Sequence, residues 1–456
     1  MFSNVLQRFM EKSPIPVMLQ LLLERVLRPE KLNEIFENTT VKQYTRTLLF
    51  SSVFDLMNLV VFKTFPNINA AYKEEGQQLG VSLTSVYNKL NGISTNISAE
   101  LVRQTAKEEA EIIVAIKGEK KPLLPGYRVK MLDGNCIEAT EHRLEVLRHT
   151  NSGPLPGKSL VVYDPSLEMA IDVFPCEDGH AQERSLLKQI LPTVKKSDVW
   201  IMDRNFCVRS FLLGIDKMKG YFICREHKKF NPKECGSEKI VGKTDTGIVY
   251  EQWVSLEDDN GKINKFRRIR LELNTATRDG AKSMTIVTNL PKSAASAKLI
   301  ADLYRTRWSI ETMFQELESH LHSEINTLGY PKAALFGFCV ALVAYNTLAV
   351  VKAGLRSEFG EETIENELSG YYLAGNITRT YDGMMVAIPE EEWEIFQNMS
   401  LPELIIIYKT LAANVNLSKF RKSRRGPKKL PPKRDKYKKH PHVSTAKLLA
   451  GIKPSE

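Results

Sequence analysis

The alternation of strand and helix patterns after Tyr127 is the feature that most constrains the fold of this chain. Short apolar segments there are separated by segments with helical spacing, an order that predicts an α/β core. We expect a mixed sheet flanked by helices. The strand candidates are 128–137, 159–164, 169–174 and 199–202, and the helix candidates are 181–191 and 208–218.

Two aspartates end strand candidates in this core. Asp133 follows the apolar run 129–132 and precedes Gly134, and Asp203 follows the run 199–202. Parallel strands gather functional groups at their carboxyl ends, so both carboxylates are expected at one edge of the sheet. Carboxylate oxygens are the ligands that hard divalent cations prefer. Each aspartate taken alone also fits a turn-capping residue.

The segment 303–321 has the spacing of one amphipathic helix. An arginine one turn before a carboxylate suits a site that grips a phosphodiester while the carboxylate holds a metal. The alternative is a surface helix with an ordinary i,i+4 ion pair between Arg307 and Glu311. The polar stripe holds Tyr304, Arg307, Glu311 and Glu318, and the apolar stripe holds Leu303, Ile310, Phe314, Leu317 and Leu321.

The N-terminal region, residues 13–119, has a helical pattern almost without strand signal. Within it, residues 79–90 resemble a helix-turn-helix, with a turn at Gly80 and an N-cap of the Ser/Thr type. A purely structural helix pair is the alternative. If the second helix enters a major groove, its DNA-binding residues are Ser85, Asn88 and Lys89.

The region 221–291 loses the helical pattern, and helices resume at Ala294. Alternating segments with turns between them predict an inserted group of strands, of which the last returns to the main sheet. These strand candidates are 239–243, 248–256, 266–274 and 284–290.

The charge of the chain favours a polyanionic partner, because the net charge is +10 and the isoelectric point is about 9.1. Basic residues concentrate in 419–439, where Asp435 is the single acid. Prolines break helices there, so we expect a flexible basic arm that binds DNA, with a solubilising tail as the alternative. Its DNA-binding candidates are Lys422, Arg424 and Arg425.

Other features point to a cytoplasmic protein. The six cysteines show no CxxC pairing, which suits a reducing compartment, and the first residues do not have the pattern of a signal peptide. The apolar segment 333–351 is long enough to suggest a membrane span, but Tyr345 and Asn346 interrupt it. We therefore expect a buried core helix and no membrane partner.

These motifs together closely resemble the signature of DDE transposases from bacterial insertion sequences. The branch in question, insertion-sequence family four, carries Tyr-x2-Arg-x3-Glu-x6-Lys. Tyr304, Arg307 and Glu311 match this signature, whereas Glu318 stands where the family has lysine. Asp203 with the following arginine matches the family motif around the second aspartate. The resemblance covers about residues 127–351 and implies an RNase H-like core.

The resemblance implies a function and a set of site residues. It makes Asp133, Asp203 and Glu311 the catalytic triad, holding two Mg²⁺ ions for which Mn²⁺ substitutes. Tyr304, Arg307 and Arg204 would then contact DNA. Trp253 could stack on a flipped base, although a strand-core role fits it equally well.

The implied activity is cut-and-paste transposition. The protein would bind terminal inverted repeats, cleave the ends through a hairpin, and join them to double-stranded target DNA as a homodimer in the nucleoid. Two alternatives stay open, a domesticated DNA-binding protein and an RNase H-like nuclease that does not transpose. The expected domains are a helical DNA-binding domain at 1–120, the catalytic core at 121–225 and 291–355, a β-strand insertion at 226–290, a helical C-terminal region at 356–416 and a basic tail at 417–456.

Overall fold

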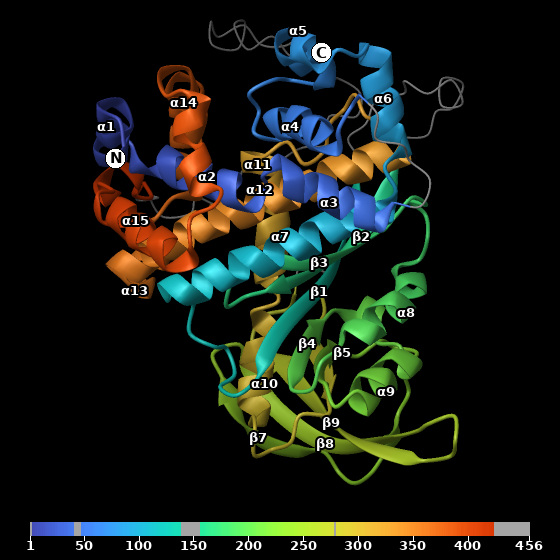
Figure 1. The fold of residues 1–456 in the computed structure, drawn as a ribbon. Helices are drawn as coiled ribbons and strands as arrows, with labels where there is room; N and C mark the ends of the chain where they lie inside the picture. Colours follow the sequence, from blue (N-terminus) through green and yellow to red (C-terminus); the bar gives the residue numbers. More distant parts are fainter. Residues whose placement is uncertain (1, 41–46, 138–155, 278–279, 424–456) are drawn as a thin grey trace, which may run out of the picture.

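The computed structural model describes residues 2–40, 47–137, 156–277 and 280–423. Helices form a body at the top of Figure 1, and one long sheet extends downward from it. The basic residues Arg424 and Arg425 lie outside the described residues.

The first half of the sheet is mixed, as the sequence predicts. β1 pairs in parallel with β4, and β4 pairs in parallel with β5. β2 is antiparallel to both β1 and β3. These strands are β1 (Arg128–Ile137), β2 (Gly157–Asp164), β3 (Met169–Cys176), β4 (Asp198–Met202) and β5 (Tyr221–Arg225).

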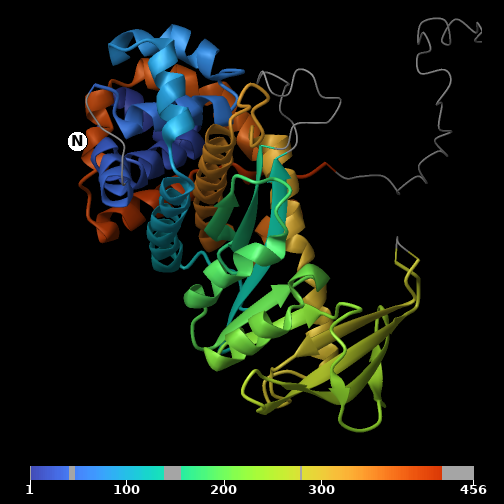
Figure 2. The same ribbon diagram turned by 90° about the vertical axis from the view of Figure 1, so that its right-hand side faces the viewer.

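The second half extends the same sheet beyond β5 (Figure 2). The predicted return of the last strand is confirmed, because β10 pairs with β5. The path across the sheet is β3-β2-β1-β4-β5-β10-β9-β8-β6, with β7 beside β8. The added strands are β6 (Lys233–Glu234), β7 (Lys239–Thr244), β8 (Gly247–Glu257), β9 (Ile263–Leu273) and β10 (Ser283–Thr288).

Helices cover both faces of the core strands because the side chains of β4 alternate between two apolar clusters. Trp200 and Met202 pack toward α8 (Leu187–Ile190) and α9 (Arg209–Lys217). Val199 and Ile201 belong to the larger cluster on the other face. The single helix expected over 181–191 is wrong, since short 3₁₀ turns flank the four-residue α8. Leu191 keeps a helical backbone, but Pro192 has no N–H to donate to the Lys188 carbonyl, so the α-helical hydrogen-bond pattern ends there.

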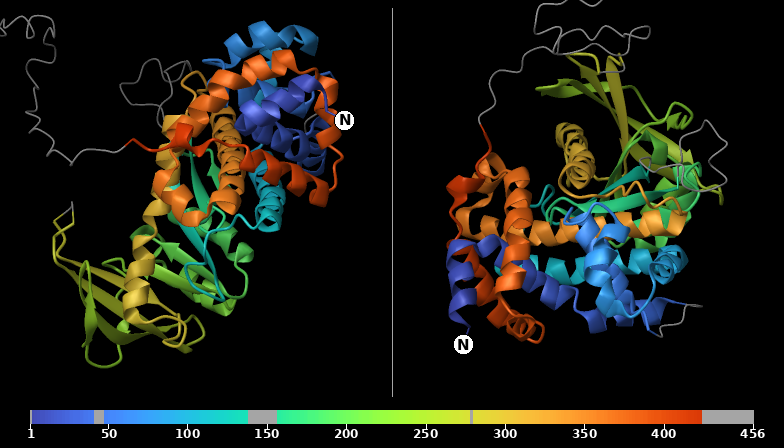
Figure 3. Two further views of the ribbon diagram at one scale, coloured as in Figure 1. Left: turned by 90° about the vertical axis from the view of Figure 1, so that its left-hand side faces the viewer. Right: turned by 90° about the horizontal axis from the view of Figure 1, so that it is seen from above.

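The helical body combines both ends of the chain. α14 and α15 pack against α2, so N-terminal and C-terminal helices lie side by side (Figure 3). The apolar helix α12 has the length of a membrane span, but 89% of its most apolar window is buried inside the protein. The predicted domain boundaries stay predictions. Helix α12 continues across the predicted boundary between the catalytic core and the C-terminal region at residue 355. The helices are α1 (Asn4–Lys12), α2 (Pro14–Val26), α3 (Pro29–Thr39), α4 (Phe50–Val61), α5 (Ile68–Glu75), α6 (Leu83–Gly92), α7 (Thr95–Ile116), α12 (Pro331–Phe359), α13 (Glu361–Glu367), α14 (Gly370–Ala387) and α15 (Leu401–Ala413).

Buried polar groups fix the contacts of α12. The Asn346 amide makes two hydrogen bonds of 2.8 Å to the backbone of Ala170 in β3. On α7, Glu109 is fully buried and accepts a 2.7 Å hydrogen bond from Thr347. Burial raises the pKa of Glu109 to about 8, although the Thr347 hydrogen bond and the charge of Lys31 lower it.

The raised pKa of Glu109 predicts a stability change with pH. Folding keeps Glu109 protonated. The stability that Glu109 contributes to the folded state is therefore complete below the ordinary pKa of 4.5 and is lost as the pH rises towards 8. Glu109→Gln keeps an acceptor for Thr347 and does not titrate. We expect this variant to gain stability relative to the parent between pH 4.5 and 8, measured by urea unfolding. The control is Glu111→Gln on the exposed side of α7. A pH-independent difference for Glu109→Gln would contradict the assignment.

Candidate functional site

Strand register brings the two aspartates together. In the parallel pairing Leu132 lies opposite Met202, so Asp133 and Asp203 each follow the last pair of the ladder. The expectation that Asp133 ends its strand is wrong, because β1 continues to Ile137 against β2. Asp133 instead marks the point where β1 separates from β4. The gathering of carboxylates at this sheet edge thus comes from the parallel pairing.

Hydrogen bonds orient both aspartates. The Asp133 Oδ1 atom accepts from the Gly134 N–H at 2.9 Å, and Asp203 Oδ1 accepts from the Asn205 N–H at 2.7 Å. Burial raises the pKa of Asp133 to about 6; Arg307 and the Gly134 hydrogen bond lower it, and the charges of Asp203 and Glu311 raise it. The three candidate carboxylates are therefore close enough to influence one another.

The expected single helix over 303–321 is wrong. α10 (Ala297–Arg305) ends before Thr306, and α11 (Trp308–His320) begins after Arg307. The Thr306 hydroxyl donates to the Leu303 carbonyl at 2.7 Å, a local hydrogen bond that competes with the helical pattern. Arg307 consequently lies in the break between two helices and leans towards the sheet.

Arg307 joins the carboxylate of α11 to the sheet. Its guanidinium donates to Asp133 Oδ2 at 2.8 Å and to Glu311 Oε1 at 2.5 Å, so the ordinary i,i+4 ion pair exists together with a second pair. Burial lowers the pKa of Arg307, but Tyr304, Asp133 and Glu311 more than offset this and raise it. Tyr304 lies in the core and not on a polar stripe, and its burial raises its pKa to about 12.

The donor set suits a hard cation. Asp133 and Glu311 contact a single arginine, Arg307, whose Nε atom is buried without a hydrogen-bond partner among the described residues, and Asp203 lies beside Asp133. Within the described part of the chain, no three His, Cys, Asp or Glu side chains are grouped at ligating distances. A metal at this site therefore requires Asp133 and Glu311 to shift away from their contacts with Arg307.

Two residues near the aspartates were not predicted. Arg225 ends β5 one position beyond the register pair of Met202 and Cys224, and its charge lowers the pKa of Tyr304. It makes no ion pair with a described residue. Glu183 lies near Asp203, whose charge raises its pKa after the larger effect of burial. Arg225 gave no signal in the sequence because the short strand β5 was not recognised. Glu183 gave none because it reaches the aspartates through contacts between segments distant in the sequence.

The other predicted DNA-binding residues lie apart from one another. In α6, Asn88 is exposed, Ser85 is half-buried, and the Lys89 ammonium lies 4.2 Å from the centre of the Phe36 ring. α6 follows α5 and a left-handed Gly80 turn, which has the layout of the expected helix pair. Lys422 is held at the body, because its ammonium donates to the Glu365 carbonyl at 2.6 Å.

Residues expected beside the carboxylates differ in exposure. Arg204 is exposed in the 3₁₀ turn after β4, and Glu318 is exposed on α11. Trp253 on β8 is 40% exposed, so the strand-core alternative is wrong for this residue. Phe314, expected in the core, is half-buried.

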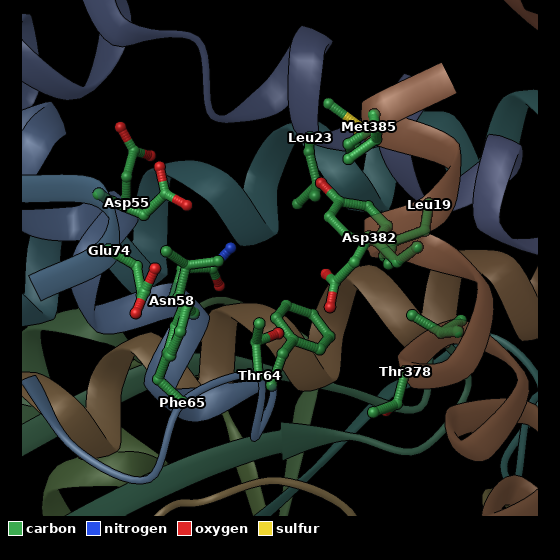
Figure 4. A pocket seen from close by; sticks show the side chains of 16 residues that line it. Leu19, Leu23, Asp55, Asn58, Thr64, Phe65, Glu74, Thr378, Asp382 and Met385 are labelled. Atoms are coloured by element: carbon green, nitrogen blue, oxygen red, sulfur yellow. The ribbon is translucent and has the colours of Figure 1, made fainter. Parts of the chain in front are cut away.

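A cavity of about 570 Å³ lies between α2, α4, α5 and α14, away from the sheet (Figure 4). Asp55, Glu74, Glu75 and Asp382 line it together with apolar side chains, and none of the described residues that line it is basic. Burial and the charges of Glu24 and Glu390 raise the pKa of Asp55 to about 7. The negative charge of this cavity makes it unsuited to a phosphate ligand.

The double ion pair of Arg307 predicts a stability effect. Arg307→Ala would leave Asp133 and Glu311 partly buried without a counter-charge, so we expect the free energy of unfolding to fall by about 1–3 kcal/mol. Arg305→Ala is the control, because its pair with Asp302 is exposed and worth less than about 1 kcal/mol. The free energy of unfolding would be measured by denaturant unfolding without metal. Equal decreases in the two variants would show that the ion pairs of Arg307 with Asp133 and Glu311 do not stabilise the fold.

Comparison with known proteins agrees with this geometry. Residues 125–347 match a family model described as Transposase DDE domain. The transposase for insertion sequence element IS421 of Escherichia coli is 32% identical over 254 residues, covering 48% of this chain and 65% of that protein. The protein y4zB of Sinorhizobium fredii (strain NBRC 101917 / NGR234), named as a transposase, is 24% identical over 206 residues, 44% of this chain and 55% of its own.

A piggyBac transposase synaptic complex with hairpin DNA, solved by cryo-EM, aligns over 84% of both chains with a TM-score of 0.37 and 11% identity. This chain matches only 55% to 65% of the length of these two relatives. A DDE domain implies the RNase H-like fold, which confirms the predicted fold class, and such domains generally use divalent metal ions. Residues 125–347 are therefore similar to a transposase DDE domain, and the matched relatives include transposases of insertion sequences.

Proposed function

We propose that this protein binds the terminal inverted repeats of an insertion sequence and catalyses metal-dependent cleavage and strand transfer, as a member of the family-four branch. The proposal includes Mg²⁺ as the metal, with Mn²⁺ as a substitute, and a homodimer on the paired ends. It also places the protein in the cytoplasm, at the nucleoid. The substrates are double-stranded transposon ends and target DNA.

One observation carries the proposal. The parallel register of β1 and β4 puts Asp133 and Asp203 at neighbouring positions, and Arg307 connects Asp133 to Glu311 on a helix more than a hundred residues later. An ordinary ion pair within one surface helix would not bring Arg307 and Glu311 to the sheet edge that carries the two aspartates. Three carboxylates and an arginine at one edge match the needs of phosphoryl transfer.

The residues have distinct roles in this proposal. Asp133, Asp203 and Glu311 would hold two divalent ions, which activate the attacking oxygen and stabilise the leaving oxygen. Arg307 would turn from the carboxylates to a DNA phosphate, for which its planar donors are suited. Arg225 ends β5 beside Asp203 without an ion pair among the described residues, and would contact the same backbone.

A direct experiment separates this function from its alternatives. Inverted repeats beside the coding region would supply the end sequence, and labelled duplexes carrying it would be incubated with protein and Mg²⁺. Specific cleavage at the repeat boundary with joining to a target plasmid supports the transposase. Specific binding without cleavage indicates a domesticated DNA-binding protein, and cleavage without joining indicates a nuclease.

The metal assignment predicts a separation of binding from cleavage. Asp203→Asn should leave end binding nearly unchanged, because phosphate contacts come mainly from Lys and Arg. Cleavage should fall by roughly a hundredfold or more, the scale of losing one preorganised charge-stabilising group. Asp302→Asn, on the exposed side of α10, is the matched control. Cleavage by Asp203→Asn within tenfold of the parent would remove Asp203 from the site.

The basic tail predicts a change in salt dependence. Ending the chain after Ser423 keeps the buried Phe420 and the Lys422 hydrogen bond and removes the basic segment that follows. For each DNA phosphate that this segment neutralises in the parent, its removal should flatten the slope of log affinity against log salt by about 0.9. The slope would be measured with a repeat-end duplex and with an unrelated duplex. An unchanged slope in both would show that this segment does not touch DNA.

A further inference from the structure

We propose that Glu183 is a positioning residue for the carboxylate site, fixing the turn after Asp203 and adding negative charge that favours a divalent cation beside it. The inference rests on the proposed function, since it assigns Glu183 to the same metal-dependent site. Glu183 is the first residue of a 3₁₀ turn between β3 and α8, and Asp203 follows it 20 positions later along the chain.

Glycine at position 134 makes room for the Glu183 carboxylate. A Cβ atom added at Gly134 would lie 2.2 Å from Glu183 Oε1 and 2.9 Å from its Cδ. Gly134 directly follows Asp133, so the carboxylate of Glu183 lies against the backbone of β1 beside the first aspartate. The tight approach explains why this strand position has no side chain.

The same side chain reaches the turn that follows Asp203. Glu183 Oε2 accepts from the Asn205 amide at 3.4 Å, while the Asn205 N–H donates to Asp203 Oδ1. The neighbouring Arg184 donates to the Asn205 carbonyl at 2.9 Å. Glu183 thus binds the side chain of Asn205, and Arg184 binds its backbone carbonyl. The backbone N–H of Asn205 in turn orients Asp203.

Charge distinguishes this role from simple bracing. Burial and then the charge of Asp203 raise the pKa of Glu183, while the Asn205 hydrogen bond and the charge of Lys158 lower it by less. The charge of Lys158 offsets the repulsion from Asp203 only in part, so a divalent cation held between Glu183 and Asp203 would be favoured by both charges. A purely structural brace would need only a hydrogen-bond acceptor.

The test is the affinity of the full-length protein for Mn²⁺, measured without DNA by electron paramagnetic resonance. Glu183→Gln keeps an acceptor for Asn205 and removes the charge. We expect its Mn²⁺ dissociation constant to rise roughly tenfold, the lower range for residues that support metal ligands. Glu177→Gln, an exposed acid of the preceding loop, should keep the parent value.

Gly134→Ala is an independent variant, because its methyl group would push the Glu183 carboxylate aside. It should weaken Mn²⁺ binding similarly, and the double variant with Glu183→Gln should show little further weakening, since both changes act on one interaction. In cleavage assays, the Mg²⁺ concentration for half-maximal rate should rise in Glu183→Gln.

The outcomes separate this inference from the proposed function. Parent-like Mn²⁺ affinity in Glu183→Gln, together with abolished binding in Asp203→Asn, would overturn the role of Glu183 and leave the transposase proposal standing. Absence of Mn²⁺ binding in the parent would also overturn it. Cleavage and joining of repeat ends by the parent would test the proposed function separately.

Discussion

The parallel pairing of β1 with β4 is the interaction on which the rest of the site depends. It is fixed by burial on both faces, because Val199 and Ile201 pack on one side and Trp200 and Met202 on the other. A shift of one residue would exchange these faces, so the register is strongly specified. The same register places Asp133 beside Asp203. The packing of the core therefore fixes the strand register, and the strand register fixes the position of the two aspartates.

Arg307 supplies the second constraint, which acts on the helices. The break at Thr306 and Arg307 turns the guanidinium toward the sheet, where it contacts Asp133 and Glu311 together. An arginine used in this way compensates two carboxylates that would otherwise repel each other in a partly buried place. It also holds Glu311 near the aspartates before DNA or metal is present. Metal binding would still require both carboxylates to leave their contacts with Arg307.

Much of this fold could be predicted from the sequence, because hydrophobic period and turn residues are local signals. β1 covers the residues that the strand pattern indicated, and the late strands lie close to their predicted ranges. β5 was missed because five residues give too short a pattern. The change to i→i−3 hydrogen bonds at Thr306 and Arg307 is too short to alter the helical pattern, and the contact of Glu183 with Gly134 depends on tertiary packing. Neither leaves a periodic trace.

Glu318, the departure from the family signature, lies outside this network. Its side chain is exposed on α11, two helical turns beyond Glu311, and it makes no hydrogen bond or ion pair with a described residue. The two ion pairs of Arg307 and the register of the strands do not involve it. A carboxylate in place of lysine therefore changes the surface charge that DNA would meet, by two units on one helix face. The assembly of the carboxylates is independent of this difference, because it is fixed by the sheet and by Arg307.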